Sequence, residues 1–515
     1  MKKRKILIIG GGIAGLSAGS YLVRNGYDTE IFEAHTRPGG VCTSWKSGDY
    51  IFDYCIHWLV GTSSGTGYDR VWKELGMLED EHGTPTPIVN FDDFSRIELP
   101  GGEVVRLYSD ADRLKEELIR IAPEDSKLIR KFTRDLKELA KGGMPAVTDN
   151  WNILDKTGFY IKNASSFLTL MKYVRMTMEQ FAGQWKNPDL KEVFRSVIPL
   201  SWSAISLVYG MAFQHTKAAG YPIGGSFPMA QNIERKYLQM GGKINYSSKV
   251  EKIIVRNAQA VGIRLDSGEE FYGDEIVSAA DGYKTLYNML DGIYLDRKLE
   301  KAYSQYSLFP STVFLGFGVA KDLSDLPHAL TIRLDEPLVL PDGSRHPYVS
   351  VNIYNFDPTL APAEKTSVTV ILHTWKDSYW KDLATKDSVA YRNVKAEIAG
   401  NILKILDSRF PGFSSAVEKT DVSTPHSVER YTHNWHGSFE GFAPTPAALM
   451  SKLPKEVPGL RNCHMVGQWT TPGGGIPPAG LDGRYLAIKL CRRDKKMFHT
   501  GSDLPGFPDP GADDS

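Results

Sequence analysis

The sequence contains little cysteine: four residues among 515. The four are Cys42, Cys55, Cys463 and Cys491, and none of them forms a CxxC pair. Small secreted domains use dense, paired cysteines, so this sparse set excludes a disulfide framework and favours structural thiols in a reducing compartment. We therefore expect a cytoplasmic protein.

An excess of charge of either sign is also missing. Lys+Arg and Asp+Glu both number 61, so the formal net charge is +0. Broad electrostatic binding of nucleic acid needs a strongly basic surface. We expect no nucleic-acid partner, and only local basic patches remain open.

Long apolar runs are absent as well. A membrane-spanning helix needs roughly 18 or more consecutive apolar residues, and no such run occurs, so no spanning helix is expected. The start, MKKRKILIIGGG, has the basic flank of a signal peptide, but its short apolar run ends in glycines and predicts a buried strand. The length of 515 residues suggests roughly two to four domains, and a hydrophobic content of 42% fits a globular protein with ample core.

Familiar catalytic sets are missing too. The sequence shows no Ser/His/Asp arrangement and no cluster with the spacing of metal ligands, so we expect no metal. His57 is the one weak candidate for a catalytic residue, as a proton relay, and a buried structural histidine is the alternative. No other catalytic acid or base can be named.

What the sequence does have is glycine in a specific arrangement near its start. KILIIGGGIAGLSAGSYLVRNGYDTEIFEA predicts a strand, a glycine turn, a helix over about 14–24 and a second strand. Gly10, Gly12 and Gly15 form G-x-G-x-x-G, which permits a tight turn, close approach of a pyrophosphate, and packing of helix on strand. Glu33 ends the second strand, where a carboxylate can accept from a ribose hydroxyl. The pattern predicts a site for NAD or FAD, with an empty structural turn as the alternative.

The rest of the chain alternates between several patterns. Residues 109–142 predict a pair of charged amphipathic helices. Residues 151–215 predict apolar, acid-poor helices, for which a core, the wall of an apolar pocket and a membrane-dipping face all stay open. After a glycine turn and a helix, we expect a strand through Val250 and a hairpin, and residues 300–435 then predict strands with Pro/Gly loops. The last fifteen residues predict a disordered tail.

Six motifs occur in one order along nearly the whole chain. They are the N-terminal glycines, Gly39-Gly40 in RPGGVCTS, YPIGGSF, VSAAD, DPTLAP, and GQWTTPGGGIPPAGLDGR. Together they resemble the phytoene desaturase, carotenoid cis–trans isomerase and retinol saturase family of FAD-dependent oxidoreductases. The resemblance implies an α/β fold: a Rossmann-type, GR2-like FAD-binding domain with a doubly wound sheet, an inserted α+β substrate domain and an apolar helical region.

The order of the motifs implies domains built from separate pieces. We expect the FAD-binding domain to combine 1–80, 220–295 and 436–498. The substrate-binding domain would combine 81–219 and 296–435, with the apolar segment 151–215 and a tail over 499–515.

The resemblance also implies which residues meet the FAD. Gly467 would lie near the ribityl and phosphate arm, and Pro478 would set up a helix begun by Ala479 and Gly480, whose N–H groups face the O2 edge of the flavin. The residues expected at the cofactor are Gly10, Gly12, Ile13, Ala14, Gly15, Glu33, Ala34, Arg37, Gly39, Gly40, Val41, His57, Val250, Ala280, Gly467, Gln468, Pro478, Ala479 and Gly480.

The resemblance further implies a long apolar polyene or isoprenoid substrate, taken from a membrane that the protein contacts peripherally on its inner face. Desaturation, isomerisation and saturation stay open as reactions. Trp202, Tyr209, His215 and Trp469 would line the substrate cavity, with aromatic core as the alternative. A flavin amine oxidase of the same fold and a non-enzymatic flavoprotein that carries or senses lipid are the other two function classes.

Overall fold

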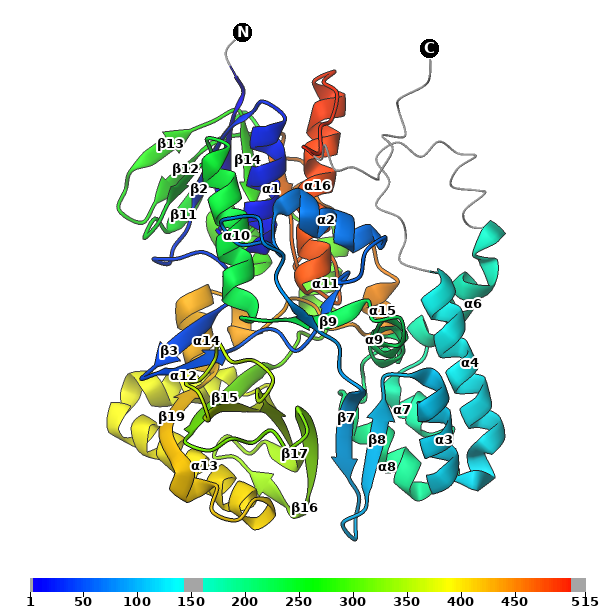
Figure 1. The fold of residues 1–515 in the computed structure, drawn as a ribbon. Coiled ribbons are helices and arrows are strands. Elements are labelled where there is room, and N and C mark those ends of the chain that lie inside the picture. Colours follow the sequence, from blue (N-terminus) through cyan, green and yellow to red (C-terminus); the bar gives the residue numbers. More distant parts are fainter. Residues whose placement is uncertain (1–2, 143–160, 502–515) are drawn as a thin grey trace.

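The computed structural model describes residues 3–142 and 161–501. Figure 1 shows three regions: an upper one around a parallel sheet, a lower one around a large sheet, and a helical one beside it. Segments far apart in the sequence lie side by side in the upper region. Its three long helices are α1 (Ile13–Arg24), α10 (Ser226–Gln239) and α16 (Ile476–Arg493).

The upper region is built on a five-stranded sheet in which all neighbouring strands pair in parallel. Ile6, Leu7 and Ile8 of its central strand are fully buried, as a strand covered on both faces requires. Three separate stretches of chain supply the strands. In spatial order these are β10 (Lys243–Asn245), β2 (Asp28–Phe32), β1 (Lys5–Ile9), β14 (Glu275–Ser278) and β20 (Cys463–Met465).

The strand expected to run through Val250 is in fact two strands. They are separated by a turn in which Ser247 has a φ of 52° and the Ser248 N–H donates to the carbonyl of Glu33 at 2.8 Å. This bond ties the turn to the end of β2, so the chain leaves the parallel sheet there. A second, antiparallel sheet follows, made of β11 (Val250–Arg256), β12 (Gln259–Leu265) and β13 (Glu270–Tyr272).

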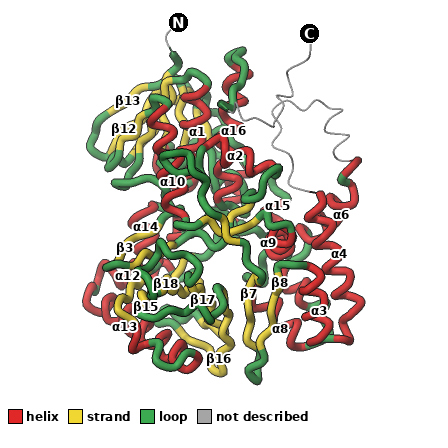
Figure 2. The backbone as a smooth tube through the Cα atoms, viewed as in Figure 1, coloured by secondary structure: helices red, strands yellow, loops and turns green. Residues whose placement is uncertain are grey.

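The lower region contains a seven-stranded sheet (Figure 2). Its strand β15 is buried along its whole length, which places it at the centre of the core. Only the β16–β7 pair is parallel within this sheet. In spatial order the strands are β19 (Val417–Ser423), β15 (Ser311–Val319), β18 (Thr366–Thr374), β17 (Arg345–Ile353), β16 (Ala329–Val339), β7 (Asp93–Glu98) and β8 (Val104–Tyr108).

The expectation that residues 300–435 hold only strands and loops is wrong. This part of the chain also contains α12 (Asp377–Lys386), α13 (Ser388–Arg409) and α14 (Pro425–Thr432). The apolar pattern of α13 is weak because only its second half is buried, through residues such as Ile398, Ile402 and Leu406. These side chains pack against the seven-stranded sheet and complete its core.

The helical region forms its own core. The amphipathic pair expected over 109–142 is present as α3 (Ala111–Ile121) and α4 (Ser126–Gly142). Of the segment expected to be apolar and helical, residues 151–160 lie outside the described residues. The remainder forms α6 (Ala164–Val174), α7 (Met178–Ala182), α8 (Pro188–Val197) and α9 (Ile205–His215).

Short elements connect the three regions. They are β3 (Ser44–Ser47), β4 (Tyr50–Asp53), β5 (Leu59–Val60), β6 (Ile88–Val89), β9 (Ala219–Pro222), α2 (Gly67–Leu75), α11 (Arg297–Gln305) and α15 (Pro446–Leu449). Of the tail expected over 499–515, the structure describes 499–501, where the His499 N–H donates to Asn25 Oδ1 at 2.7 Å. Within the described residues, no helix is both long and apolar enough to cross a membrane.

Candidate functional site

A cavity of about 1500 Å³ lies where the upper region meets the other two. The ends of β1, β2 and β14 border it, together with the segments 33–43, 54–60 and 466–479. Small-molecule sites usually measure about 300–1,000 Å³, so this cavity has room for a dinucleotide and a second ligand. No group of His, Cys, Asp and Glu that could hold a metal ion occurs in the part of the chain that the structure describes.

The glycine turn after β1 forms one wall of this cavity. A Cβ on Gly15 would lie 2.0 Å from the Gly10 carbonyl oxygen, so α1 can approach the turn only because residue 15 has no side chain. Gly12 is the N-cap of α1 and brings no side-chain cap, which leaves the helix N-terminus to bind something else. Ile13 and Ala14, in the first turn, line the cavity. A helix N-terminus exposed in this way suits a phosphate.

Glu33 lies beside the same turn. Its Oε2 accepts from the Gly11 N–H at 2.6 Å and its Oε1 from the His35 N–H at 2.7 Å. Burial raises the pKa of Glu33, and the backbone N–H groups act in the opposite direction. The two bonds fix the carboxylate at the cavity wall and leave lone pairs for hydroxyl donors such as those of a ribose.

The tandem glycines fold back against the turn. The Gly39 N–H donates to the Gly11 carbonyl at 2.9 Å, and Gly39 and Gly40 have φ angles of 113° and 61°. A Cβ on Gly40 would lie 3.5 Å from the Gly12 Cα. Segment 37–43 therefore lies directly against the place where the first turn leaves room for a pyrophosphate.

The glycine- and proline-rich segment near the C-terminus completes the cavity. The Gly467 N–H donates to Asp482 Oδ2 at 3.0 Å, and a Cβ on Gly467 would lie 3.0 Å from that of Ala14. Asp482 thus holds this turn against the start of α1. The four residues after Thr471 are a proline and three glycines, so this part of the wall carries few side-chain atoms.

The helix expected to begin at Ala479 begins three residues earlier, at Ile476. Pro477 and Pro478 occupy its first turn and carry no N–H, and the Ala479 N–H donates to the Gly475 carbonyl at 3.3 Å. The set of N–H groups offered to a flavin edge is therefore smaller than the sequence suggests.

Most residues expected at the cofactor lie together on the cavity wall. Gly15 and Gly480 do not: Gly15 packs against Gly10, while the Gly480 carbonyl accepts from Ser17 Oγ at 2.7 Å. The residues that do line the cavity are Gly10, Gly12, Ile13, Ala14, Glu33, Ala34, Arg37, Gly39, Gly40, Val41, His57, Val250, Ala280, Gly467, Gln468, Pro478 and Ala479.

The four residues expected at the substrate cavity divide in the same way. Trp202, Tyr209 and Trp469 line it. His215 does not, and its Nδ1 instead accepts the Ala111 N–H at 3.2 Å, at the beginning of α3. The aromatic residues are therefore placed to contact a ligand, whereas His215 caps a helix.

His57 lies on the cavity wall and is held in place on one side. Its Nε2 and Asn352 Nδ2 are 3.2 Å apart, at hydrogen-bonding distance. Burial lowers the pKa of His57 to about 4. The imidazole is therefore neutral at physiological pH, which fits a structural histidine better than a group that delivers protons.

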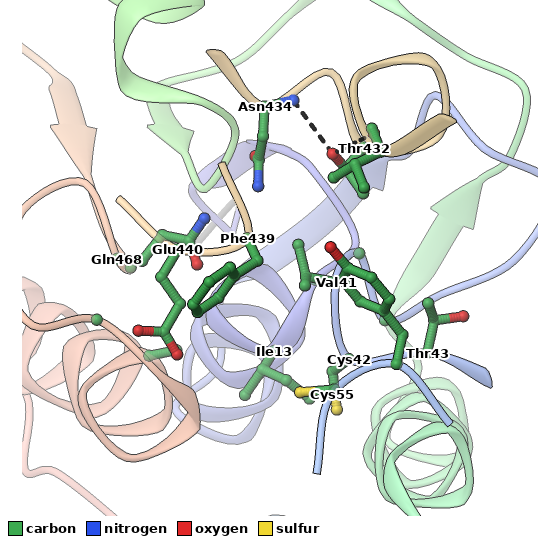
Figure 3. Close-up of a pocket in the computed structure, with 18 of the residues that line it drawn as sticks. Ile13, Val41, Cys42, Thr43, Cys55, Thr432, Asn434, Phe439, Glu440 and Gln468 are labelled. Carbon is green, nitrogen blue, oxygen red and sulfur yellow. Dashed lines mark hydrogen bonds between the residues drawn. The ribbon is translucent and has the colours of Figure 1, made fainter. Parts of the chain in front are cut away.

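Glu440, which sequence analysis does not identify, lines the cavity beside Phe439 and close to Gln468 (Figure 3). Burial raises the pKa of Glu440 to about 8. Its neighbours in GSFEGF show no charge pattern that distinguishes it from a surface glutamate. Only the fold, which brings residue 440 against 468–475, identifies it.

The arrangement fits FAD. Glu33 and the α1 N-terminus match the ribose and the diphosphate. The segments around Gly40 and Gly467 have the close backbone approach that a bound dinucleotide needs. When bound, FAD supplies hydride transfer at N5, while the protein binds, orients and excludes water.

The chain is similar to known flavoproteins over most of its length. Residues 13–488 match the family model of flavin-containing amine oxidoreductases. The prolycopene isomerase of Daucus carota is 24% identical over 501 residues, covering 94% of this chain and 79% of that protein. The neurosporene-forming phytoene desaturase of Rhodobacter capsulatus is 26% identical over 517 residues, covering 94% of this chain and 93% of that one.

A solved structure of wild-type putrescine oxidase has the same fold. It has a TM-score of 0.60 and 14% identity, and the match covers 96% of this chain and all of that one. At this identity the likeness concerns the fold alone. With the family model matched over most of its length, the chain belongs to the flavin-containing amine oxidoreductases and is an FAD-dependent oxidoreductase.

Proposed function

We propose that this oxidoreductase acts on a long, apolar polyene or isoprenoid lipid. The observation that carries the proposal is the second part of the cavity, beyond the glycine turns. It is lined by apolar and aromatic side chains from the helical region and the seven-stranded sheet: Val197, Ile198, Trp202, Tyr209, Phe213 and Ile371. Such a wall suits a hydrocarbon chain.

The relatives support the same substrate class. The two described above are named for polyene isomerisation and desaturation, and both match nearly all of this chain. Aromatic walls would hold a polyene in one orientation, and the surrounding sheet and helices would exclude water from it. The nineteen cofactor residues expected from the sequence are part of this proposal, with Gly15 and Gly480 acting through packing rather than contact.

Product analysis tests the substrate class. Phytoene and prolycopene would be incubated separately in liposomes with FAD-loaded protein, and the products analysed by mass and retention time. We expect a loss of hydrogen from phytoene if the reaction is desaturation, or an unchanged mass with shifted retention of prolycopene if it is isomerisation. A gain of hydrogen by prolycopene would mean saturation.

Putrescine serves as the comparison substrate in the same experiment. Peroxide release from putrescine, without change in either polyene, would contradict the proposal and favour an amine oxidase. Inactivity toward all three would remove the polyene assignment as well.

We also propose that α6 contacts a membrane surface. Ile161, Phe167 and Leu168 are 72%, 44% and 70% exposed, and the helix contains no acidic residue. Lys162 lies beside this apolar face, where it could approach lipid phosphates. The same helical region supplies part of the apolar cavity wall, so the path of a lipid-dissolved substrate from the membrane to the cavity would be short.

Liposome flotation checks the membrane contact. Replacing Phe167 and Leu168 together with glutamate is expected to lower the fraction of protein that floats with anionic liposomes by at least about tenfold, because charge at an apolar contact is costly. Val389→Glu is the matched control, since Val389 is 56% exposed on the distant helix α13. Wild-type protein that stays at the bottom of the gradient would contradict the proposal.

A further inference from the structure

We propose that Glu440 is a catalytic acid–base residue that exchanges one proton with the substrate in this cavity. The inference rests on the proposed function, because it assumes a substrate that loses or gains hydrogen at carbon. It concerns a residue for which neither the sequence motifs nor the comparisons give any role.

The position of the carboxyl group is the first argument. Glu440 Oε2 lies 3.0 Å from the Cβ position of Gly474, and Oε1 lies 3.5 Å from that of Gly475. A Cβ on Gly441 would lie 2.6 Å from the Gln468 carbonyl oxygen, so the loop that carries Glu440 is pressed against the 468–475 backbone. The carboxyl group therefore lies on the loop proposed to hold the flavin, next to the N-terminus of α16.

The second argument is that no residue of the described chain binds the carboxyl oxygens of Glu440. Within residues 3–142 and 161–501, no hydrogen bond or ion pair reaches Oε1 or Oε2 of Glu440. Asp281, a buried carboxylate of the same cavity, accepts backbone N–H groups from Lys284 and Trp435, each at 2.7 Å. The Asp281 carboxylate therefore stabilises the local backbone, whereas the Glu440 carboxyl group is available to a ligand.

Three titratable side chains that line the same cavity, those of His57, His373 and Cys55, do not change charge near neutral pH. Burial lowers the pKa values of His57 and His373 to about 4 each, and the ring of His373 stacks on Phe439. The pKa of Cys55 is raised by its hydrogen bond with the Cys42 thiol and by burial. The 468–475 loop itself carries no titratable side chain. With a pKa of about 8, Glu440 changes charge where these neighbours do not.

Both desaturation and isomerisation need a group that exchanges a proton with a carbon of the substrate. Removing two hydrogens from a C–C bond sends a hydride, with its electron pair, to FAD as the oxidant. The Glu440 carboxylate takes the proton from the adjacent carbon, and the electrons of that C–H bond become the new double bond. In an isomerisation the neutral acid donates its proton to a polyene carbon and later takes one back, so no net redox change occurs. General acid–base catalysis of this kind is worth about 10²–10⁴-fold in rate.

An infrared titration of the protein without substrate tests the protonation of Glu440. In the wild type we expect a protonated-carboxyl absorption that is lost with a midpoint near pH 8, in both FAD-free and FAD-loaded protein. Glu440→Gln, which mimics the shape of the neutral acid, should fold normally and lack this band. Glu116→Gln, on the exposed face of α3, is the control that should keep it. Persistence of the band in Glu440→Gln would overturn the assignment.

Turnover of the polyene tests the catalytic role. We expect Glu440→Gln to lower kcat by about 10²–10⁴-fold with little change in KM, and Glu440→Asp to retain part of the rate. Because the group is neutral below about pH 8, kcat should rise through that pH if Glu440 acts as the base and fall if it acts as the acid. Equal turnover by Glu440→Gln and wild type would overturn this role and leave the proposed function standing. Absence of wild-type turnover would overturn the proposed function, and this role with it.

Discussion

Replacing Arg484 with methionine is expected to lower the free energy of unfolding by about 3–5 kcal/mol. Arg484 is fully buried in α16, where its Nε and Nη2 donate to Glu74 Oε2 and Oε1 at 2.7 and 3.0 Å. The Tyr21 hydroxyl donates to the same carboxylate at 2.6 Å. Methionine fills a similar volume but leaves Glu74 without its main buried counter-charge, and an uncompensated buried carboxylate is costly. Urea denaturation of the FAD-loaded protein measures the loss.

Arg120→Met is the matched control, because it makes the same replacement at a pair on the surface. Arg120 is 53% exposed and pairs with Glu103 and Glu117, so its loss should cost only about 0–1 kcal/mol. The double variant Arg484→Met with Glu74→Leu should recover part of the stability, since it removes the buried charge but leaves the Tyr21 hydroxyl without its acceptor. A loss below about 1 kcal/mol in Arg484→Met would show that Arg70 and Tyr21 satisfy Glu74 without it.

The pair also explains why the flavin-binding parts hold together. Glu74 lies on α2, Tyr21 on α1 and Arg484 on α16, so one carboxylate joins three helices, the last of them 410 residues along the chain from Glu74. Lys455 makes a further ion pair with Asp482 of α16, which in turn holds Gly467. The cavity wall is thus stabilised by buried charges that lie behind it.

A feature of the fold or the site could be predicted from the sequence when the residues that determine it lie close together in the chain. The first glycine turn could be predicted because the contacts that determine it are made within about twenty residues of the chain. Gly15 packs against Gly10, and the Glu33 carboxylate accepts from the Gly11 N–H. Through their order and the family resemblance, the tandem glycines and the C-terminal motif could be expected to lie together, and the structure brings both to the cavity wall. In these cases the backbone conformation itself demands a particular residue type.

Other features depend on partners that the local sequence does not reveal. The pattern of α13 is weak because half of the helix faces water, and the break before Val250 depends on Ser248 bonding to the end of β2. Glu440 resembles any glutamate until the fold places its carboxyl group against Gly474. Fewer N–H groups are offered at the start of α16 than expected, because Pro477 and Pro478 in its first turn carry none.

Replacing Gly15 with alanine is expected to raise the dissociation constant of FAD by about ten- to hundredfold. The new Cβ would lie 2.0 Å from the Gly10 carbonyl oxygen and 3.1 Å from its carbon, and backbone atoms cannot rotate out of the way as a side chain can. The start of α1 must therefore move away from the turn. Overpacking of this kind costs about 1–3 kcal/mol, and each 1.4 kcal/mol corresponds to about tenfold in affinity. Titration of FAD-free protein with FAD measures the change.

Gly400→Ala is the control, because Gly400 also lies within a helix and nothing stands within 4 Å of its Cβ position. It should leave FAD affinity unchanged and stabilise the protein by about 0.5–1 kcal/mol, since alanine is the better helix former. Gly15 does not touch the cavity, so a loss of affinity in its variant would come from the displaced helix N-terminus. Unchanged affinity in Gly15→Ala would mean that the phosphate site tolerates such a displacement, and that the close packing of α1 on the turn serves stability alone.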